Sequence, residues 1–296
     1  MDGGDFITLK SGYRIWYKIT GARTGIPLLT LHGGPGAGHD YLEPLEALGA
    51  ERPVIFYDQL GCGKSDKPDS RALWTIERFA DEIDEVRHAL GLEHLHMLGQ
   101  SWGGWLGVEY LLRHPKGLQS MVLASTSASI PQFTAECNRL IGELPENMQD
   151  ALAVHGLRSD YDRQDYQAAM MEFYRRHVCR LPEWPDCLMR TVANLDRNQV
   201  YDTINGPNEF TTIGNLRYWD RLAELHTIKT PVLLTCGRYD ELGPMCSQSM
   251  LERIPDARLQ IFEHSAHTAH IEEAPAYMDC VSAFLRDIEQ RQKVSA

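Results

Sequence analysis

The segment Gly99–Gly103 has the pattern G-x-S-x-G, with Ser101 at its centre. A serine in this pattern stands on a tight turn between a strand and a helix, where small flanking residues relieve crowding of the backbone. The apolar residues 95–98 predict a strand before the turn, and a helical pattern follows it to about residue 113. The context predicts that Ser101 is a nucleophile, and that the N-terminus of the following helix stabilises the negative charge that develops during its reaction.

A serine hydroxyl is a weak nucleophile and needs a neighbouring base that an acid orients. In folds built around this turn, the acid and the base follow the serine along the chain, in loops after later strands. Asp240 follows the predicted strand at residues 232–236, and His267 follows the one at 258–262. The chain order therefore predicts a triad of Ser101, Asp240 and His267.

Other residues compete for the roles of acid and base. Asp58 also follows a predicted strand, but it precedes the serine in the chain, which makes it the weaker candidate for the acid. His264 and His270 lie close to His267 in the sequence and compete with it for the role of the base. The residues alone favour Asp240 and His267 and leave these alternatives open.

The segment His32–Gly36 reads H-G-G-P-G and follows a short apolar run at residues 27–31. A glycine-rich loop keeps backbone N–H groups free of side-chain obstruction, as an oxyanion hole requires. An N–H group of this loop and that of Trp102 are therefore predicted to hold the oxyanion.

Three other kinds of site fail on spacing. Gly61–Ser65 resembles the end of a phosphate-binding loop, but Asp58 occupies the position of the required upstream glycine. The histidines within residues 264–270 could share one face of a helix as zinc ligands, but the H-E-x-x-H pattern is missing. Cys62 has no histidine near it in the sequence that would activate its thiol. We therefore predict no metal site.

Alternating strand and helix patterns surround these motifs. Between residues 76 and 90, apolar residues recur at helical spacing, with Thr75 as a cap at the start and Gly91 at the end. The alternation predicts an α/β fold with a mostly parallel sheet and right-handed crossovers. The predicted strands are residues 6–9, 13–18, 27–31, 54–57, 95–98, 121–124, 232–236 and 258–262, and a last helix begins near Pro275.

The alternation stops between residues 129 and 222. Charged, helix-forming and aromatic segments fill this stretch, and prolines interrupt it. A stretch of roughly 90 residues is too long for a plain loop. We therefore predict a helical cap at residues 129–222, inserted into a core made of residues 1–128 and 223–296.

The composition narrows the class of protein. The 296 residues include 41 Asp or Glu and 29 Lys or Arg, and the net charge of −12 argues against a nucleic-acid or membrane partner. No apolar stretch approaches the ~18 residues of a membrane-spanning helix, and the acidic N-terminus is unlike a secretory signal. The seven cysteines form no C-x-x-C pair, which predicts free thiols and a cytoplasmic protein.

Several motifs together resemble the proline iminopeptidase family of α/β hydrolases: His32–Gly36, Tyr57–Ser65, the turn at Ser101, and Gly206–Thr211. The likeness runs through the predicted core, the insertion and the C-terminal lobe, and is strongest to the tricorn-interacting aminopeptidase branch. It implies the α/β-hydrolase fold, a mostly parallel sheet flanked by helices with an inserted helical cap.

The resemblance assigns roles to particular residues. Ser101 matches the nucleophile, Asp240 the acid and His267 the base. Gly34 and Trp102 match the two backbone donors of the oxyanion hole, although the family more usually has a tyrosine at the second position.

Glu209 and Glu241 match carboxylates that hold the free α-amine of the substrate. Spacing alone gives them no such role, because exposed glutamates are common on protein surfaces. The chemical reason is that an ammonium group buried under a cap needs carboxylates to offset its lost hydration.

The resemblance implies a serine hydrolase that releases an N-terminal residue, with proline favoured, from a small peptide or amino-acid amide, and that needs no cofactor. Two alternatives stay open. An esterase or lactonase with the same triad would not need Glu209 and Glu241. A non-catalytic small-molecule receptor would have no need for both the triad and the oxyanion loop. The acyl residue, the leaving group and the oligomeric state are left open.

Overall fold

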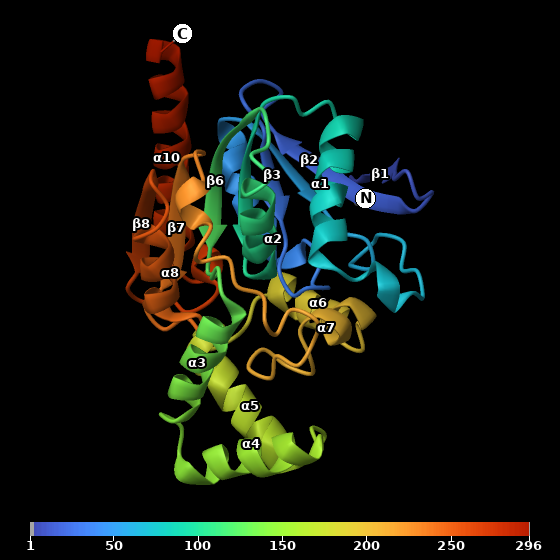
Figure 1. The fold of residues 1–296 in the computed structure, drawn as a ribbon, viewed down its shortest axis with the longest axis vertical. Coiled ribbons are helices and arrows are strands. Elements are labelled where there is room, and N and C mark those ends of the chain that lie inside the picture. Colours follow the sequence, from blue (N-terminus) through green and yellow to red (C-terminus); the bar gives the residue numbers. More distant parts are fainter. Residues whose placement is uncertain (1–2, 296) are drawn as a thin grey trace.

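The computed structural model describes residues 3–295 and contains an eight-stranded sheet with helices on both faces (Figure 1). The strand order is β1-β2-β4-β3-β5-β6-β7-β8. The pairs β1–β2 and β2–β4 are antiparallel and the other pairs are parallel, which confirms the predicted α/β architecture. The strands are β1 Asp5–Thr8, β2 Arg14–Gly21, β3 Leu28–Leu31, β4 Pro53–Tyr57, β5 Leu95–Gln100, β6 Leu118–Ala124, β7 Val232–Gly237 and β8 Ala257–Phe262.

The two faces of the sheet bury different apolar cores because successive residues of a strand point to opposite sides. In β6, Met121 and Leu123 belong to one core, and Val122 and Ala124 belong to the other. Helices α1 (Ile76–Ala89), α2 (Trp102–Leu111) and α8 (Gly243–Leu251) close the first core. The 3₁₀ helix η1 (Asp40–Ala50) and helix α10 (Ala274–Ser295) close the second. Three short helices, η2 (Arg71–Leu73), η3 (Leu225–Thr227) and α9 (Ala269–Glu272), lie in connections.

Helix α1 has the ends that the sequence predicts. The side chain of Thr75 accepts a hydrogen bond from the N–H of Arg78 at 3.3 Å, as an N-terminal cap does. Gly91 follows the helix with a φ of +65°, a conformation that favours glycine at a helix end. Both predictions are confirmed.

A helical segment connects β6 to β7. It contains α3 (Ile130–Ile141), α4 (Glu146–Arg158), α5 (Gln164–His177), α6 (Asp186–Leu195) and α7 (Gln199–Ile204). Figure 1 shows α6 and α7 close to the edge where the parallel strands end, and α3, α4 and α5 extending away from it. An isolated bridge between Ser129 and Asp220 holds the two ends of the segment together. The division into a core and a cap at residues 129–222 stays a prediction.

Helix η1 and the bounds of β2 and β6 differ most from the sequence-based expectation; β2 ends at Gly21, three residues beyond the expected end. Helix η1 lies outside the predicted elements: Tyr41, Leu45 and Leu48 recur at helical spacing, but Pro44 interrupts the pattern. Strand β6 begins at Leu118, three residues before the expected start at Met121. None of these differences moves a residue of the predicted triad to another element.

The cysteine and membrane expectations can be compared with the structure directly. All seven cysteines are free, and five of them are buried, which confirms the prediction of free thiols. Among residues 3–295, no helix has both the length and the apolar character that crossing a bilayer requires.

Candidate active site

A cavity of about 450 Å³ lies between the helical segment and the loops that follow the parallel strands. Ser101 and His267 line it from the loops after β5 and β8, and Gly34 lines it from the loop after β3. Glu209 lines it from the helical segment. Four of the predicted site residues therefore meet at one cavity.

Ser101 stands on a strained turn between β5 and α2. Its φ of 57° and ψ of −122° are unusual for a residue with a side chain, and such strain is typical of functional turns. A Cβ added at Gly99 would collide with the carbonyl oxygen of Gly103, and one added at Gly103 would collide with that of Leu31. The small residues of the G-x-S-x-G pattern are therefore what allows the turn to form.

The loop after β3 lies against Ser101. The N–H of Gly33 donates to the hydroxyl of Tyr41 at 2.8 Å, and a Cβ added at Gly33 would come within 3.0 Å of the Cβ of Ser101. The next residue, Gly34, has a φ of +106° and lines the cavity. Trp102 is the first residue of α2, so its N–H has no acceptor within the helix. Gly34 lines the same cavity as Ser101, and Trp102 directly follows Ser101 in the chain; their role as oxyanion donors stays a prediction.

A second set of contacts, made by His32 and Gln59, holds the loop after β3 in place. The N–H of Gln59 donates to Nε2 of His32 at 3.0 Å, and Nδ1 of His32 contacts the carbonyl oxygen of Gly33 at 2.9 Å. Burial lowers the pKa of His32, which keeps its Nε2 available as an acceptor. The indole N–H of Trp102 donates to Oε1 of Gln59 at 2.8 Å. The motifs at residues 32–36 and 57–65 therefore act as one support for the turn at Ser101.

His267 and Asp240 form a buried pair. Nδ1 of His267 lies 2.9 Å from Oδ1 of Asp240, and Asp240 also accepts a hydrogen bond from the N–H of Leu242 at 3.1 Å. A carboxylate at Nδ1 holds that proton and leaves Nε2 free to accept one. The side-chain amide of Gln100, the residue before Ser101, donates to the carbonyl oxygen of His267 at 3.0 Å, which ties the two loops together.

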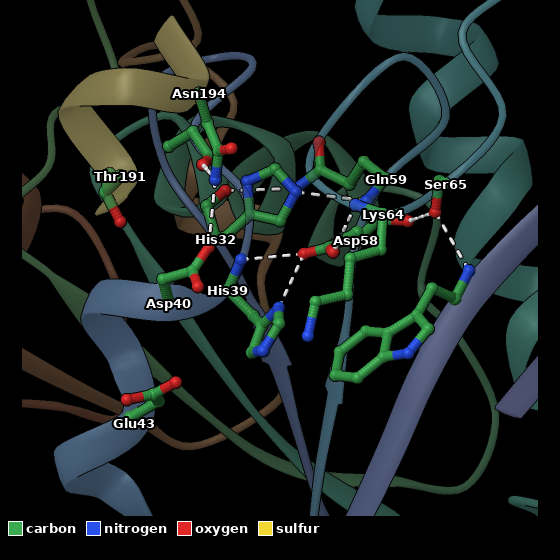
Figure 2. A network of polar contacts seen from close by, with 12 residues as sticks. His32, His39, Asp40, Glu43, Asp58, Gln59, Lys64, Ser65, Thr191 and Asn194 are labelled. Atoms are coloured by element: carbon green, nitrogen blue, oxygen red, sulfur yellow. Dashed lines mark hydrogen bonds and ion pairs between the residues drawn. The ribbon is translucent and has the colours of Figure 1, made fainter. Parts of the chain in front are cut away.

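The competing acid and bases have other partners. Asp58 accepts hydrogen bonds from the backbone N–H and the ring Nδ1 of His39, at 2.7 and 2.8 Å, and from the N–H of Lys64 (Figure 2). Nε2 of His270 contacts the carbonyl oxygen of Tyr41 at 3.0 Å, and the backbone of His264 donates to Glu273. Asp58 therefore shapes the loop at residues 58–64, and the histidine beside Asp240 is His267.

The histidines within residues 264–270 do not converge on a common point. The group of potential metal ligands found in the described part of the chain is instead His39, Asp40 and Glu43 (Figure 2). Arg190 already pairs with both carboxylates of this group, at 3.0 and 2.6 Å. We therefore assign no metal to it.

Glu241 and Glu209 add two carboxylates next to His267. Oε1 of Glu241 lies 3.8 Å from Nε2 of His267, and its Oε2 is buried with no hydrogen-bond partner among the described residues. Oε1 of Glu209 accepts a hydrogen bond from the hydroxyl of Tyr201 at 2.9 Å. A buried carboxylate oxygen without a donor is costly unless a ligand satisfies it. The arrangement thus favours a cationic ligand with N–H donors.

The pKa shifts follow from the same crowding of negative charge. Burial and the charge of Glu209 raise the pKa of Glu241 well above its usual value. Burial also raises the pKa of Glu209. Burial alone would lower the pKa of the His267 imidazole, but the surrounding carboxylates, Asp240 first, outweigh it and raise the value to about 9. All three shifts have the same consequence: a proton or another cation bound among these groups is stabilised.

Comparison with known proteins agrees with this geometry. A family model described as the alpha/beta hydrolase fold matches residues 26–274. The proline iminopeptidase of Heyndrickxia coagulans is 36% identical over 283 residues, covering 96% of this chain and 98% of that protein. The one from Lactobacillus delbrueckii subsp. bulgaricus is 39% identical, covering 92% and 94%. The chain belongs to the proline iminopeptidase family of α/β hydrolases.

Solved structures support the assignment to this family. The crystal structure of the proline iminopeptidase of Mycobacterium smegmatis superposes with a TM-score of 0.92 at 36% identity, covering 98% of this chain and 99% of that one. The structure of VinJ superposes with a TM-score of 0.93, also at 36% identity, covering 97% and 99%. The chain is thus a family member over nearly its whole length. The more specific likeness to the tricorn-interacting branch stays a prediction.

Several residues of this site carry no signal in the sequence. The hydroxyls of Tyr201 and Tyr174 contact the side chain and the backbone of Glu209, respectively. His177, the last residue of α5, accepts hydrogen bonds at its carbonyl oxygen from the N–H of Glu241 at 3.2 Å and that of His267 at 3.3 Å. A backbone carbonyl leaves no mark in the residue type, so no pattern could have found His177.

Proposed function

We propose that this chain is a serine aminopeptidase or amidase that releases an N-terminal residue bearing a free amine. The observation that carries the proposal is the buried carboxylate of Glu241, with an oxygen that has no partner, next to Nε2 of His267. Glu209 supplies a second carboxylate at the same place. A hydrolase acting on neutral esters would have no use for two buried carboxyl groups at this place.

The mechanism assigns one role to each predicted residue. His267 removes the proton of Ser101, and Asp240 holds the imidazole and stabilises its protonated form. The hydroxyl oxygen attacks the carbonyl carbon, and the N–H groups of Gly34 and Trp102 hold the oxyanion. His267 then protonates the leaving amine, and water releases the acyl group by the same route.

Glu209 and Glu241 determine where the chain is cut. The α-amine is separated from the scissile carbonyl carbon by one atom, Cα. If the carboxylates hold the ammonium group, a single residue precedes the bond that Ser101 attacks, so the enzyme is an exopeptidase. The relatives named proline iminopeptidase support proline as the favoured first residue. A small peptide or amino-acid amide is the proposed substrate, and the cytoplasm is the proposed location.

A substrate panel tests this function. Prolyl amides with a free amine should be hydrolysed, whereas their N-acetyl derivatives should be almost inert, because acetylation removes the charge and adds bulk where the carboxylates converge. A serine-directed phosphonate should inactivate the enzyme, and EDTA should leave it active. Comparable kcat/KM values for free and acetylated prolyl amides would contradict the proposal and favour an esterase or lactonase.

A further inference from the structure

The cavity is longer than the acyl part of the proposed substrate. The volume of about 450 Å³ exceeds what an aminoacyl group needs when its amine lies at Glu209 and its carbonyl lies at Ser101. The cavity continues along α6, where Trp184, Leu188, Val192 and Leu195 line it. The group that leaves is the part of the substrate that must extend into this space.

Helix α6 presents an apolar stripe to the cavity. Leu188, Val192 and Leu195 are spaced by four and three residues, so they lie on one face of the helix. Val192 is 42% exposed although it is apolar. The cavity-lining residues of this helix carry no charge; Asp196 and Arg197 line the cavity just beyond its end.

The other contacts of α6 hold this stripe in place. Arg190 forms ion pairs with Asp40 and Glu43 of η1 (3.0 and 2.6 Å). The hydroxyl of Thr191 accepts a hydrogen bond from the N–H of Tyr41 at 3.1 Å, and the side-chain amide of Asn194 donates to the carbonyl oxygen of Ala37 at 2.9 Å. The helix is therefore fastened to the loop beside Ser101, with its apolar residues left facing the cavity.

We propose that the stripe formed by Trp184, Leu188, Val192 and Leu195 is the subsite for the leaving group, and that it takes a large apolar amine. In chemical terms, the substrate is an amide of an N-terminal residue with an apolar second residue or an arylamine. A charged leaving group next to the scissile bond would lose hydration against this wall without gaining a partner. This inference rests on the proposed function and adds the class of leaving group to it.

The test is a series of prolyl compounds that differ only in the leaving group. The members are prolinamide and the C-terminal amides of Pro-Gly, Pro-Leu, Pro-Phe, Pro-Glu and Pro-Lys. We expect kcat/KM for the leucine and phenylalanine members to exceed that for glycine by about tenfold or more, because each buried methylene contributes about fourfold. The glutamate and lysine members should be no better than glycine.

Substitutions in α6 test whether the preference for apolar leaving groups depends on the stripe. Val192→Asp should remove most of the advantage of the leucine member, and it should lower kcat/KM for that member far more than for prolinamide, whose ammonia does not reach the stripe. Val192→Thr keeps the shape and should give a smaller loss in the same direction. Met189→Asp is the matched control, because Met189 is an exposed apolar residue of the same helix that does not line the cavity. It should leave the series unchanged.

The outcomes separate the two proposals. Hydrolysis of prolinamide with no advantage for apolar leaving groups would overturn the leaving-group subsite and leave the proposed function standing. The subsite would also be overturned if Val192→Asp lowered kcat/KM equally for all members of the series. A preference for peptides with a free C-terminal carboxylate over the apolar amides would assign this end of the cavity to Arg197 and would also overturn the subsite. If no free-amine amide is hydrolysed, the proposed function fails and the subsite fails with it.

Discussion

The loops at the strand ends and the helical segment between β6 and β7 contribute to the site in different ways. The loops after β3, β5, β7 and β8 hold the residues to which we assign the oxyanion hole, the nucleophile, the acid and the base. The helical segment supplies Glu209, the apolar stripe of α6, and the carbonyl of His177. On the assignment proposed above, the groups of acyl transfer come from the loops, whereas substrate selection uses Glu209 and the α6 stripe of the helical segment together with Glu241 of the loop after β7. The difference suggests that chemistry and specificity can be changed separately in this protein.

The largest effect should come from the nucleophile. Ser101→Ala should lower kcat by a factor on the order of 10⁶, because His267 then has no hydroxyl to activate. The thermal unfolding temperature should stay close to that of wild type, since the substitution removes one oxygen. Ser282→Ala, far from the cavity on α10, is the control. A folded Ser101→Ala enzyme with most of its activity would show that the chemistry lies elsewhere.

The amine-binding carboxylates should give the next largest effect. Glu209→Gln or Glu241→Gln should lower kcat/KM for prolyl amides by roughly 30-fold to several-thousand-fold, since losing one partner of a buried charge pair costs about 2–5 kcal/mol. Glu263→Gln removes an exposed carboxylate and should change kcat/KM less than twofold. Equal losses for charged and uncharged substrates would argue against a role in amine binding.

The pH dependence of kcat/KM should show that the amine-binding carboxylates affect the catalytic base. His267 is active as a base only when it is neutral, and neighbouring carboxylates raise its pKa to about 9. Removing the charge of Glu241 removes one of the groups that stabilise the imidazolium, so the pKa falls. The acid limb of kcat/KM should therefore move to lower pH in Glu241→Gln. An uncharged substrate, 4-nitrophenyl cyclopentanecarboxylate, avoids titration of the amine. An acid limb that stays in place would contradict this coupling.

The smallest effect should come from His177, which positions the loops of the acid and the base. Its Nδ1 contacts the carbonyl oxygen of Tyr239, next to Asp240, at 2.9 Å. His177→Leu should lower kcat by about fivefold, the value of one ordinary hydrogen bond. His177→Asn, whose amide can donate in place of Nδ1–H, should restore most of the loss. The acid limb should also move to lower pH in His177→Leu, because a loosened Asp240 stabilises the imidazolium less. A purely structural role would leave that limb unchanged.

The functional residues of the loops can be predicted from the sequence more completely than those of the helical segment. Ser101, Asp240 and His267 can be found because each follows a predicted strand, fully buried for β5 and β7 and at the sheet edge for β8. Glu209 and Glu241 become candidates only through the family resemblance, because burial of a glutamate contradicts what its residue type suggests. His177 could not be found at all, since its contacts with Glu241 and His267 use a backbone carbonyl. The sequence predicts helices in the segment that contains α6, but no pattern in it indicates that the apolar stripe of α6 faces the cavity.

The central claim is that Glu209 of the helical segment, together with Glu241 of the loop after β7, makes a general hydrolase specific for a free amine. Prolyl 4-nitroanilide and cyclopentanecarbonyl 4-nitroanilide have nearly the same shape and differ by an NH₂⁺ in place of a CH₂. The ratio of their kcat/KM values in wild type and in Glu209→Gln isolates the contribution of the charge. We predict that wild type strongly prefers the prolyl compound, and that Glu209→Gln reduces the ratio by roughly 30-fold or more. The same ratio in both enzymes would contradict the account.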